Sequence, residues 1–212
     1  MDRKTYDLLH GIPDHADYAA EAGELDAEDI PQERMTAVLD LLRNSDDYVV
    51  RFEAAKLLTS WGILEGLVAL SESMEKPELI KNTYPHRLHG YDDTYRQILM
   101  AVTMYFANMV DRGQREVARA QVFLPLSTII ELAGTEPFEI SDAFAFLKRE
   151  RYPEYIPFVK QHLSSIIDRP EIHQWKIYDA MEFLMGVEPE FVMSLLQLRN
   201  KSIEDFMPRQ RS

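Results

Sequence analysis

The chain has 212 residues, of which 46% are hydrophobic and 28% are charged, and its formal net charge is −13. This composition is typical of a globular protein and excludes a wholly disordered one. The absence of cysteine excludes disulfides and cysteine-ligated zinc or redox sites. Because proteins that bind nucleic acid or anionic membranes present basic surfaces, the negative charge argues against both partners.

The first thirty residues are predicted to form an acidic N-terminal flank or cap, residues 1–30. Residues 1–47 hold thirteen acidic and four basic side chains, which gives −9 of the total −13. Asp14–Asp29 contains seven carboxylates and no Lys or Arg. Such a stretch is either a solvated surface or a docking surface for a basic partner. The candidate docking residues are Asp14, Asp17, Glu21 and Glu24.

The N-terminus contains no apolar core of the kind that a signal peptide needs. No window reaches the apolar length of a membrane span, and 117–133, which comes nearest, contains charged residues and a proline. We therefore expect a cytoplasmic protein.

From Pro31 onward the apolar spacing is helical. Apolar residues at 35, 38, 39 and 42 predict a first helix, and the polar run 44–47 ends it and offers an N-cap to the next one. A second stripe, 50–61, ends at Gly62, and a third, 63–74, ends near Pro77.

A loop is expected at about 76–92, because this segment has no helical period and contains Pro77, Pro85 and Gly90. Loops of this length inside a helical array are either functional or disordered. Tyr and Arg often anchor protein interfaces. The candidate contact residues are therefore Tyr84, Arg87, His89 and Tyr91, with a plain surface loop as the other interpretation. His86-x-x-His89 is too generic a spacing to predict a metal site.

Helical stripes resume at 95–109 and continue through 114–133, where Pro125 predicts a kink or break and Gly134 a C-terminal cap. Further stripes lie at 140–147, 156–167, 177–184 and 192–196. Residues 207–212 are polar and are expected to be a frayed tail. No segment has the alternating pattern of a strand.

An internal repeat is visible when residues 46–58 are laid on 92–102 with an offset of 45 residues. Periods in the forties are typical of HEAT and armadillo arrays. The segment 38–58 resembles a HEAT unit, with a Leu-Leu pair ending a first helix, an Asp in the turn, and Val-Arg and Ala-Ala in the second helix. The matching residues are Asp47, Val50, Arg51, Ala54 and Ala55. The second unit keeps Asp92 and Arg96.

This resemblance implies an all-α fold, a right-handed α-solenoid or α-α superhelix of about four antiparallel HEAT-like helix pairs. The pairs would be 33–61, 63–110, 114–150 and 153–186, within a single helical repeat domain at 31–206. In HEAT arrays such Asp and Arg residues form structural ion pairs, so we expect Asp47 to pair with Arg51 and Asp92 with Arg96.

The fold and the acidic charge favour a non-enzymatic protein–protein binding module whose partner is another protein, a basic one. A bacterial immunity protein that neutralises a basic toxin is one such module. The alternative is a HEAT-like enzyme or chaperone-type lyase acting on a bound small molecule or chromophore, since proteins similar to this fold include DNA glycosylases and proteins that help to attach bilins. No nucleophile or phosphate-binding motif occurs, so no catalytic residue, metal or cofactor is predicted.

Overall fold

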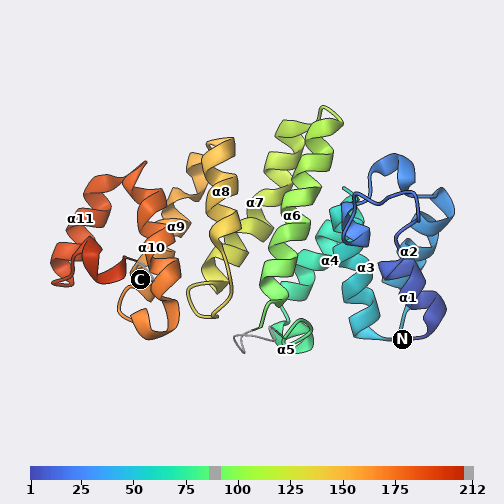
Figure 1. The fold of residues 1–212 in the computed structure, drawn as a ribbon, viewed down its shortest axis with the longest axis horizontal. Coiled ribbons are helices and arrows are strands. Elements are labelled where there is room, and N and C mark those ends of the chain that lie inside the picture. The colour runs from blue at the N-terminus through green and yellow to red at the C-terminus, as the bar shows by residue number, and fades with distance from the viewer. Residues whose placement is uncertain (86–91, 208–212) are drawn as a thin grey trace. The chain divides into compact units, whose positions relative to one another are not determined.

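The computed structural model describes residues 1–85 and 92–207, and in this part of the chain the secondary structure is helical with no strand (Figure 1). This confirms the prediction of an all-α fold. The chain divides into two compact units, Met1–Pro125 and Leu126–Ser212. Within the described ranges, no helix combines the length and the apolar character needed to cross a membrane.

The first unit contains six helices and the beginning of a seventh. Their bounds are α1 Arg3–His10, α2 Gln32–Asn44, α3 Tyr48–Ser60, α4 Leu64–Met74, α5 Pro77–Ile80, α6 Thr94–Asp111 and α7 Arg115–Leu132. The boundary between the units falls inside α7 at Pro125, and the helix runs through this proline. Neither α1 nor the single turn α5 was predicted, because α1 buries only Leu9 and α5 lies within the expected loop.

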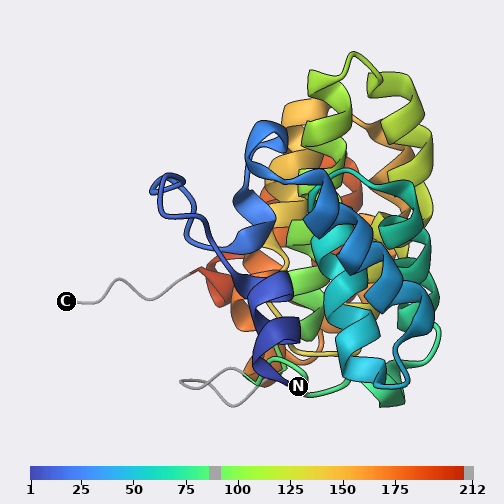
Figure 2. The same cartoon turned by 90° about the vertical axis from the view of Figure 1, so that its right-hand side faces the viewer.

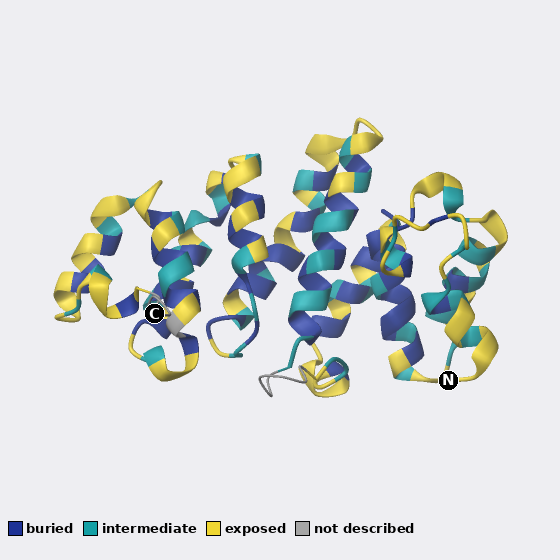
Figure 3. Ribbon diagram, in the orientation of Figure 1, coloured by how far each residue is buried: buried dark blue, intermediate teal, exposed yellow. Residues whose placement is uncertain are grey.

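Helix α3 lies at the centre of the first unit, where it packs against α2, α4 and α6. Nine of its thirteen residues are buried, and Figure 3 shows most of this helix in dark blue. The Asp47 carboxylate caps its start by accepting from the backbone amides of Val49 and Val50. Gly62 follows its end at a φ of +73°, a left-handed conformation that favours glycine. Both predicted ends of this helix are therefore confirmed.

Small residues bring α4 very close to α3. Ala54 and Ala55 of α3 are buried, and Gly66 of α4 faces this helix. A Cβ atom on Gly66 would lie only 2.6 Å from the Cβ of Leu58 and 2.8 Å from the carbonyl oxygen of Ala55. The two helices can therefore keep this separation only with glycine at position 66.

The N-terminal segment is packed onto the first unit. Leu9, Ala16, Ala22 and Leu25 are buried, and α1 lies beside α2 and α3 (Figure 2). The Trp61 indole N–H donates to the carbonyl oxygen of Ala22 at 2.8 Å. Scattered apolar residues thus attach an otherwise acidic segment to the core.

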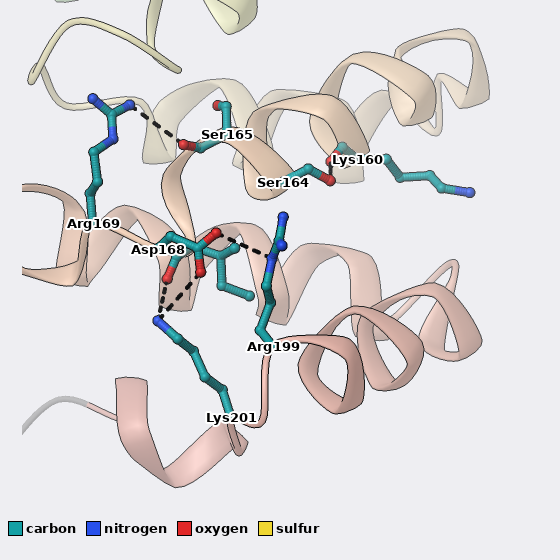
Figure 4. A network of polar contacts seen from close by, with 8 residues as sticks. Lys160, Ser164, Ser165, Asp168, Arg169, Arg199 and Lys201 are labelled. Atoms are coloured by element: carbon teal, nitrogen blue, oxygen red, sulfur yellow. Dashed lines mark hydrogen bonds and ion pairs between the residues drawn. The ribbon is translucent and has the colours of Figure 1, made fainter.

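The second unit contains the end of α7 and four further helices, α8 Ser141–Glu150, α9 Ile156–Ile166, α10 Pro170–Met185 and α11 Pro189–Leu198. Helix α10 is central, because it packs against α8, α9, α11 and the short 3₁₀ turn Ile203–Phe206. Near the end of α9, Asp168 lies 3.2 Å from the Arg199 guanidinium and 3.8 Å from the Lys201 ammonium group (Figure 4). These contacts attach the C-terminal segment to the unit.

Cations from later helices cap helix C-termini in both units. Arg112, the residue that follows α6, donates to the carbonyl oxygens of Trp61 and Gly62 at 2.9 and 3.0 Å, just after α3. Lys176 of α10 is fully buried and donates to the carbonyl oxygens of Ala133 and Glu136 at 3.0 and 2.8 Å, just after α7. A positive charge at these positions satisfies carbonyl groups that the helix leaves free and complements its dipole.

Candidate functional site

The first unit has a cavity of about 330 Å³ between α3, α6 and the N-terminal segment. We call it the α3–α6 groove. Its lining includes the apolar residues Leu57 of α3 and Met100, Ala101 and Met104 of α6, which we call its floor. Methionine side chains are flexible and polarisable, so a floor of this kind can adapt to differently shaped apolar groups.

Three carboxylates line the groove, those of Glu21, Glu24 and Glu53. The basic groups in its lining are His10 and Lys56, and the Lys56 ammonium lies 3.5 Å from Glu53. We call the exposed residues Glu21 and Glu24 the rim of the groove. Their negative charges favour a positively charged ligand over a negatively charged one.

Tyr84 is a half-buried residue in the wall of the groove. Its hydroxyl donates to the Glu53 carboxylate and accepts from the Lys56 ammonium group. Burial, and then the neighbouring Glu53 charge, raise the pKa of Tyr84 above the usual range of a tyrosine. Tyr84 thus ties the segment after α5 to α3, and it also contributes to the groove.

Of the other predicted contact residues, Glu21 and Glu24 are exposed and line the groove. Glu24 also accepts from the backbone amide of Ala20 at 2.7 Å. Asp14 and Asp17 are exposed but do not belong to the described lining of this groove. The remaining three predicted residues, Arg87, His89 and Tyr91, lie outside the described residues.

The acidic segment has a defined local structure that its own carboxylates help to build. The Tyr18 hydroxyl donates to Asp29 at 2.7 Å and accepts from the backbone amide of Asp26 at 2.9 Å. His15 lies 2.9 Å from the same Asp29 carboxylate. Hydrogen bonds from Tyr18 and then His15 lower the pKa of Asp29. The segment therefore carries its charge on an ordered loop.

The predicted pair of Asp47 and Arg51 has separate partners in the structure, which corrects the expected ion pair. The Asp47 carboxylate is used as the N-cap of α3. Arg51 reaches back to donate to the carbonyl oxygen of Ser45 at 2.5 Å, and its guanidinium lies over the Tyr48 ring. Capping holds the carboxylate at the helix start, so the arginine binds the preceding turn instead.

Asp92 and Arg96 each contact other residues. Arg96 lies 3.7 Å from Asp93. Asp92 accepts from the backbone amides of Asn82 at 2.7 Å and of Thr94 at 3.0 Å. Its position just before α6 makes it a local acceptor for the ends of the loop.

Sequence reasoning missed Glu53, Lys56, Met100 and Met104 as groove residues. Glu53 and Lys56 could have been found, because they are charged residues that interrupt the apolar pattern of a helix that is buried on several sides. The two methionines carry no such signal, because apolar residues in a helical stripe are most often core.

Comparison with known proteins found no family model, no curated protein and no solved structure that matches this chain. The function is therefore inferred from the groove and its charges.

Proposed function

We propose that this chain is a non-enzymatic protein-binding module that takes a basic segment of a partner protein into the α3–α6 groove. The observation that carries this proposal is that Met100 and Met104 line the same groove as the carboxylates of Glu21 and Glu24. A segment with both apolar and basic side chains matches such a groove, since its apolar groups meet the floor and its charges meet the rim.

The proposal includes a HEAT-like stacking of helix pairs. The resemblance at 38–58 supports it, as do the capping role of Asp47, the buried small residues Ala54 and Ala55, and the close approach of Gly66 to Ala55. Stacked pairs of this type generate extended binding surfaces. The superhelical arrangement itself is part of the proposal.

The partner that we propose is a basic protein met in the cytoplasm. An immunity protein that neutralises a basic toxin is the specific form that fits this chemistry. A net charge of −13 accelerates encounter with such a partner and disfavours nucleic acid.

A capture experiment with a matched pair of variants tests this function. The full-length tagged chain is used at low and at high salt, and captured proteins are identified by mass spectrometry. Met104→Lys places a positive charge on the groove floor, whereas Met193→Lys places the same charge at an exposed site in α11 of the other unit. We expect wild type and Met193→Lys to capture the same basic protein, Met104→Lys to lose it, and high salt to weaken it.

Circular dichroism confirms that each variant is folded, and Gln97→Lys, at another groove position, is used if Met104→Lys is not. Capture that the groove variants do not change would contradict the assignment of the groove. Capture of an acidic or neutral partner that ignores salt would contradict the electrostatic basis.

A further inference from the structure

The second unit has its own, larger cavity of about 630 Å³ between α8, the turn that follows it, and α10. Small-molecule sites in proteins typically enclose about 300–1,000 Å³, so this cavity is of that size. Its apolar walls come from both helices and from the turn, as Phe144, Leu147, Tyr152, Ile156, Phe183 and Val187.

Packing behind these walls holds the cavity open. The Phe144 and Phe183 rings stack with centroids 5.7 Å apart, and the Phe144 ring also lies 6.1 Å from the buried His162 ring. Phe144, Leu147 and Tyr152 are buried among neighbouring side chains. Rings that are fixed by neighbours on several sides form a preorganised wall rather than a surface that collapses in the absence of a ligand.

Two positive charges stand at the mouth of the cavity. Lys148 in the last turn of α8 and Arg151 just after it are both exposed and line the cavity. Arg151 has a φ of 56°, a left-handed conformation that ends the helix and starts the turn at this side of the cavity. Glu182 is the one exposed acid in the lining. The exposed charged groups in the lining are therefore two cations and one carboxylate.

The polar group inside the cavity is a pair formed by Ser141 and Asp179. The Ser141 hydroxyl lies 2.9 Å from the Asp179 carboxyl and also contacts the Glu139 carboxyl. The Ser141 hydroxyl has a single proton, so it can donate to only one of the two carboxyl groups. The second carboxyl group can also hydrogen-bond to Ser141 if it is protonated and donates to the serine oxygen. Burial raises the pKa of Asp179 above the usual range of an aspartic acid.

We propose that this cavity binds a small amphipathic organic anion, with an apolar chain or ring packed against the wall that Phe144 and Phe183 form and a carboxylate held by Lys148 and Arg151. The apolar walls supply the larger part of the affinity, and the charges of Lys148 and Arg151 determine which head group is preferred. All of the residues that form this site belong to the second unit, so the site is independent of the α3–α6 groove.

Three probes with the same eight-carbon chain test the head-group preference: octanoate, octanol and octyltrimethylammonium. Binding to the full chain is measured by isothermal titration calorimetry at neutral pH. We expect saturable binding of octanoate, weaker binding of octanol, and the weakest binding of the cation. A cation that binds as tightly as octanoate, or no saturable binding of octanoate, overturns the proposal.

Variants locate the binding. The double variant Lys148→Gln/Arg151→Asn removes both charges, and asparagine tolerates the left-handed backbone at position 151. We expect it to weaken octanoate by about fivefold, since exposed ion pairs contribute little individually, and to leave octanol unchanged. The matched control is Arg149→Gln, because Arg149 also lies in the last turn of α8 but outside the described lining of the cavity. An equal loss in this control overturns the assignment of the head-group site.

A cavity-filling variant completes the test. Ala145 is exposed on the α8 side of the cavity, so Ala145→Trp fills the space with little effect on the core. We expect binding of both octanoate and octanol to be lost. If circular dichroism shows that this variant does not fold, Val187→Trp fills the same space from the α10 side. Retained binding in a folded, filled variant overturns the proposal.

Discussion

His162 and His173 are buried histidines in the second unit, and neither ring nitrogen of either residue has a hydrogen-bond partner among the described residues. Burial, and then the nearby Lys176 charge, lower the pKa of His162 to about 3 and that of His173 to about 4. Both rings are therefore neutral wherever the fold persists near neutral pH.

We predict that acid destabilises the protein through these two histidines. The ordinary pKa of histidine is 6.5 and both folded values are lower, so the unfolded chain binds protons first as the pH falls. Stability is complete above about pH 6.5 and should fall by roughly 2 kcal/mol for each histidine at pH 5. Urea unfolding as a function of pH measures this loss.

His162→Met separates the contribution of one ring. The variant should lose less stability between pH 7 and pH 5 than wild type and should be at least as stable at pH 7, because it removes an unpaired buried nitrogen. An unchanged pH dependence would show that other groups dominate acid unfolding.

Part of the candidate site could be predicted at the level of residues. Tyr84, Glu21 and Glu24 stand out in the sequence as an aromatic residue in a long loop and as acids in a run without bases. The groove floor could not be predicted in this way, since Met100 and Met104 have the spacing of ordinary core residues. Which face of α6 stays open depends on how far the N-terminal segment covers it, and this is tertiary information.

At the scale of elements, α3 shows how much the sequence determines locally. The Asp47 cap, the helical stripe and the turn at Gly62 were all predictable, because each depends on neighbours in the chain. Helix α1 was not, since a short amphipathic segment becomes helical only when a core such as that around Trp61 accepts its single buried leucine. Pro125 predicted a kink or break, and of these two the break does not occur, because α7 continues through this residue.

The contact between α3 and α4 gives a prediction about packing. Gly66→Ala should destabilise the protein by about 2–3 kcal/mol, because the added methyl group has no space against the α3 backbone and Leu58. Gly186→Ala is the control, since a Cβ there meets only the Phe183 carbonyl oxygen at 3.4 Å and the backbone is helical. Chemical denaturation measures both. Similar effects of the two substitutions would mean that the helices can separate at little cost.

At the scale of the whole molecule, the sequence has 36 acidic and 23 basic side chains, and several of the bases point inward. Five of them donate hydrogen bonds to backbone carbonyl groups. Arg34 donates to Leu8, Arg112 to Trp61 and Gly62, and Arg169 to Gly134. Lys176 donates to Ala133 and Glu136, and Lys201 donates to Ile167. These positively charged side chains are therefore engaged in hydrogen bonds within the protein. The acids of the N-terminal segment, in contrast, are mostly exposed.

This charge distribution predicts that salt stabilises the protein. Raising sodium chloride from about 0.02 M to about 0.3 M should increase the thermal midpoint by a few degrees, because it screens repulsion between exposed carboxylates more than it weakens the buried contacts. The triple variant Asp14→Asn/Asp17→Asn/Glu28→Gln should show a smaller increase. A midpoint that falls with salt would indicate that surface ion pairs outweigh the repulsion.

The position of Lys176 also makes it an internal reporter. An amine that is fully enclosed, with its pKa lowered to about 8, is chemically reactive but inaccessible as long as the second unit remains closed. Acylating reagents should therefore modify the surface lysines at once and this one only during opening events. The rate of its labelling would measure how often the second unit opens in solution, without any engineered probe.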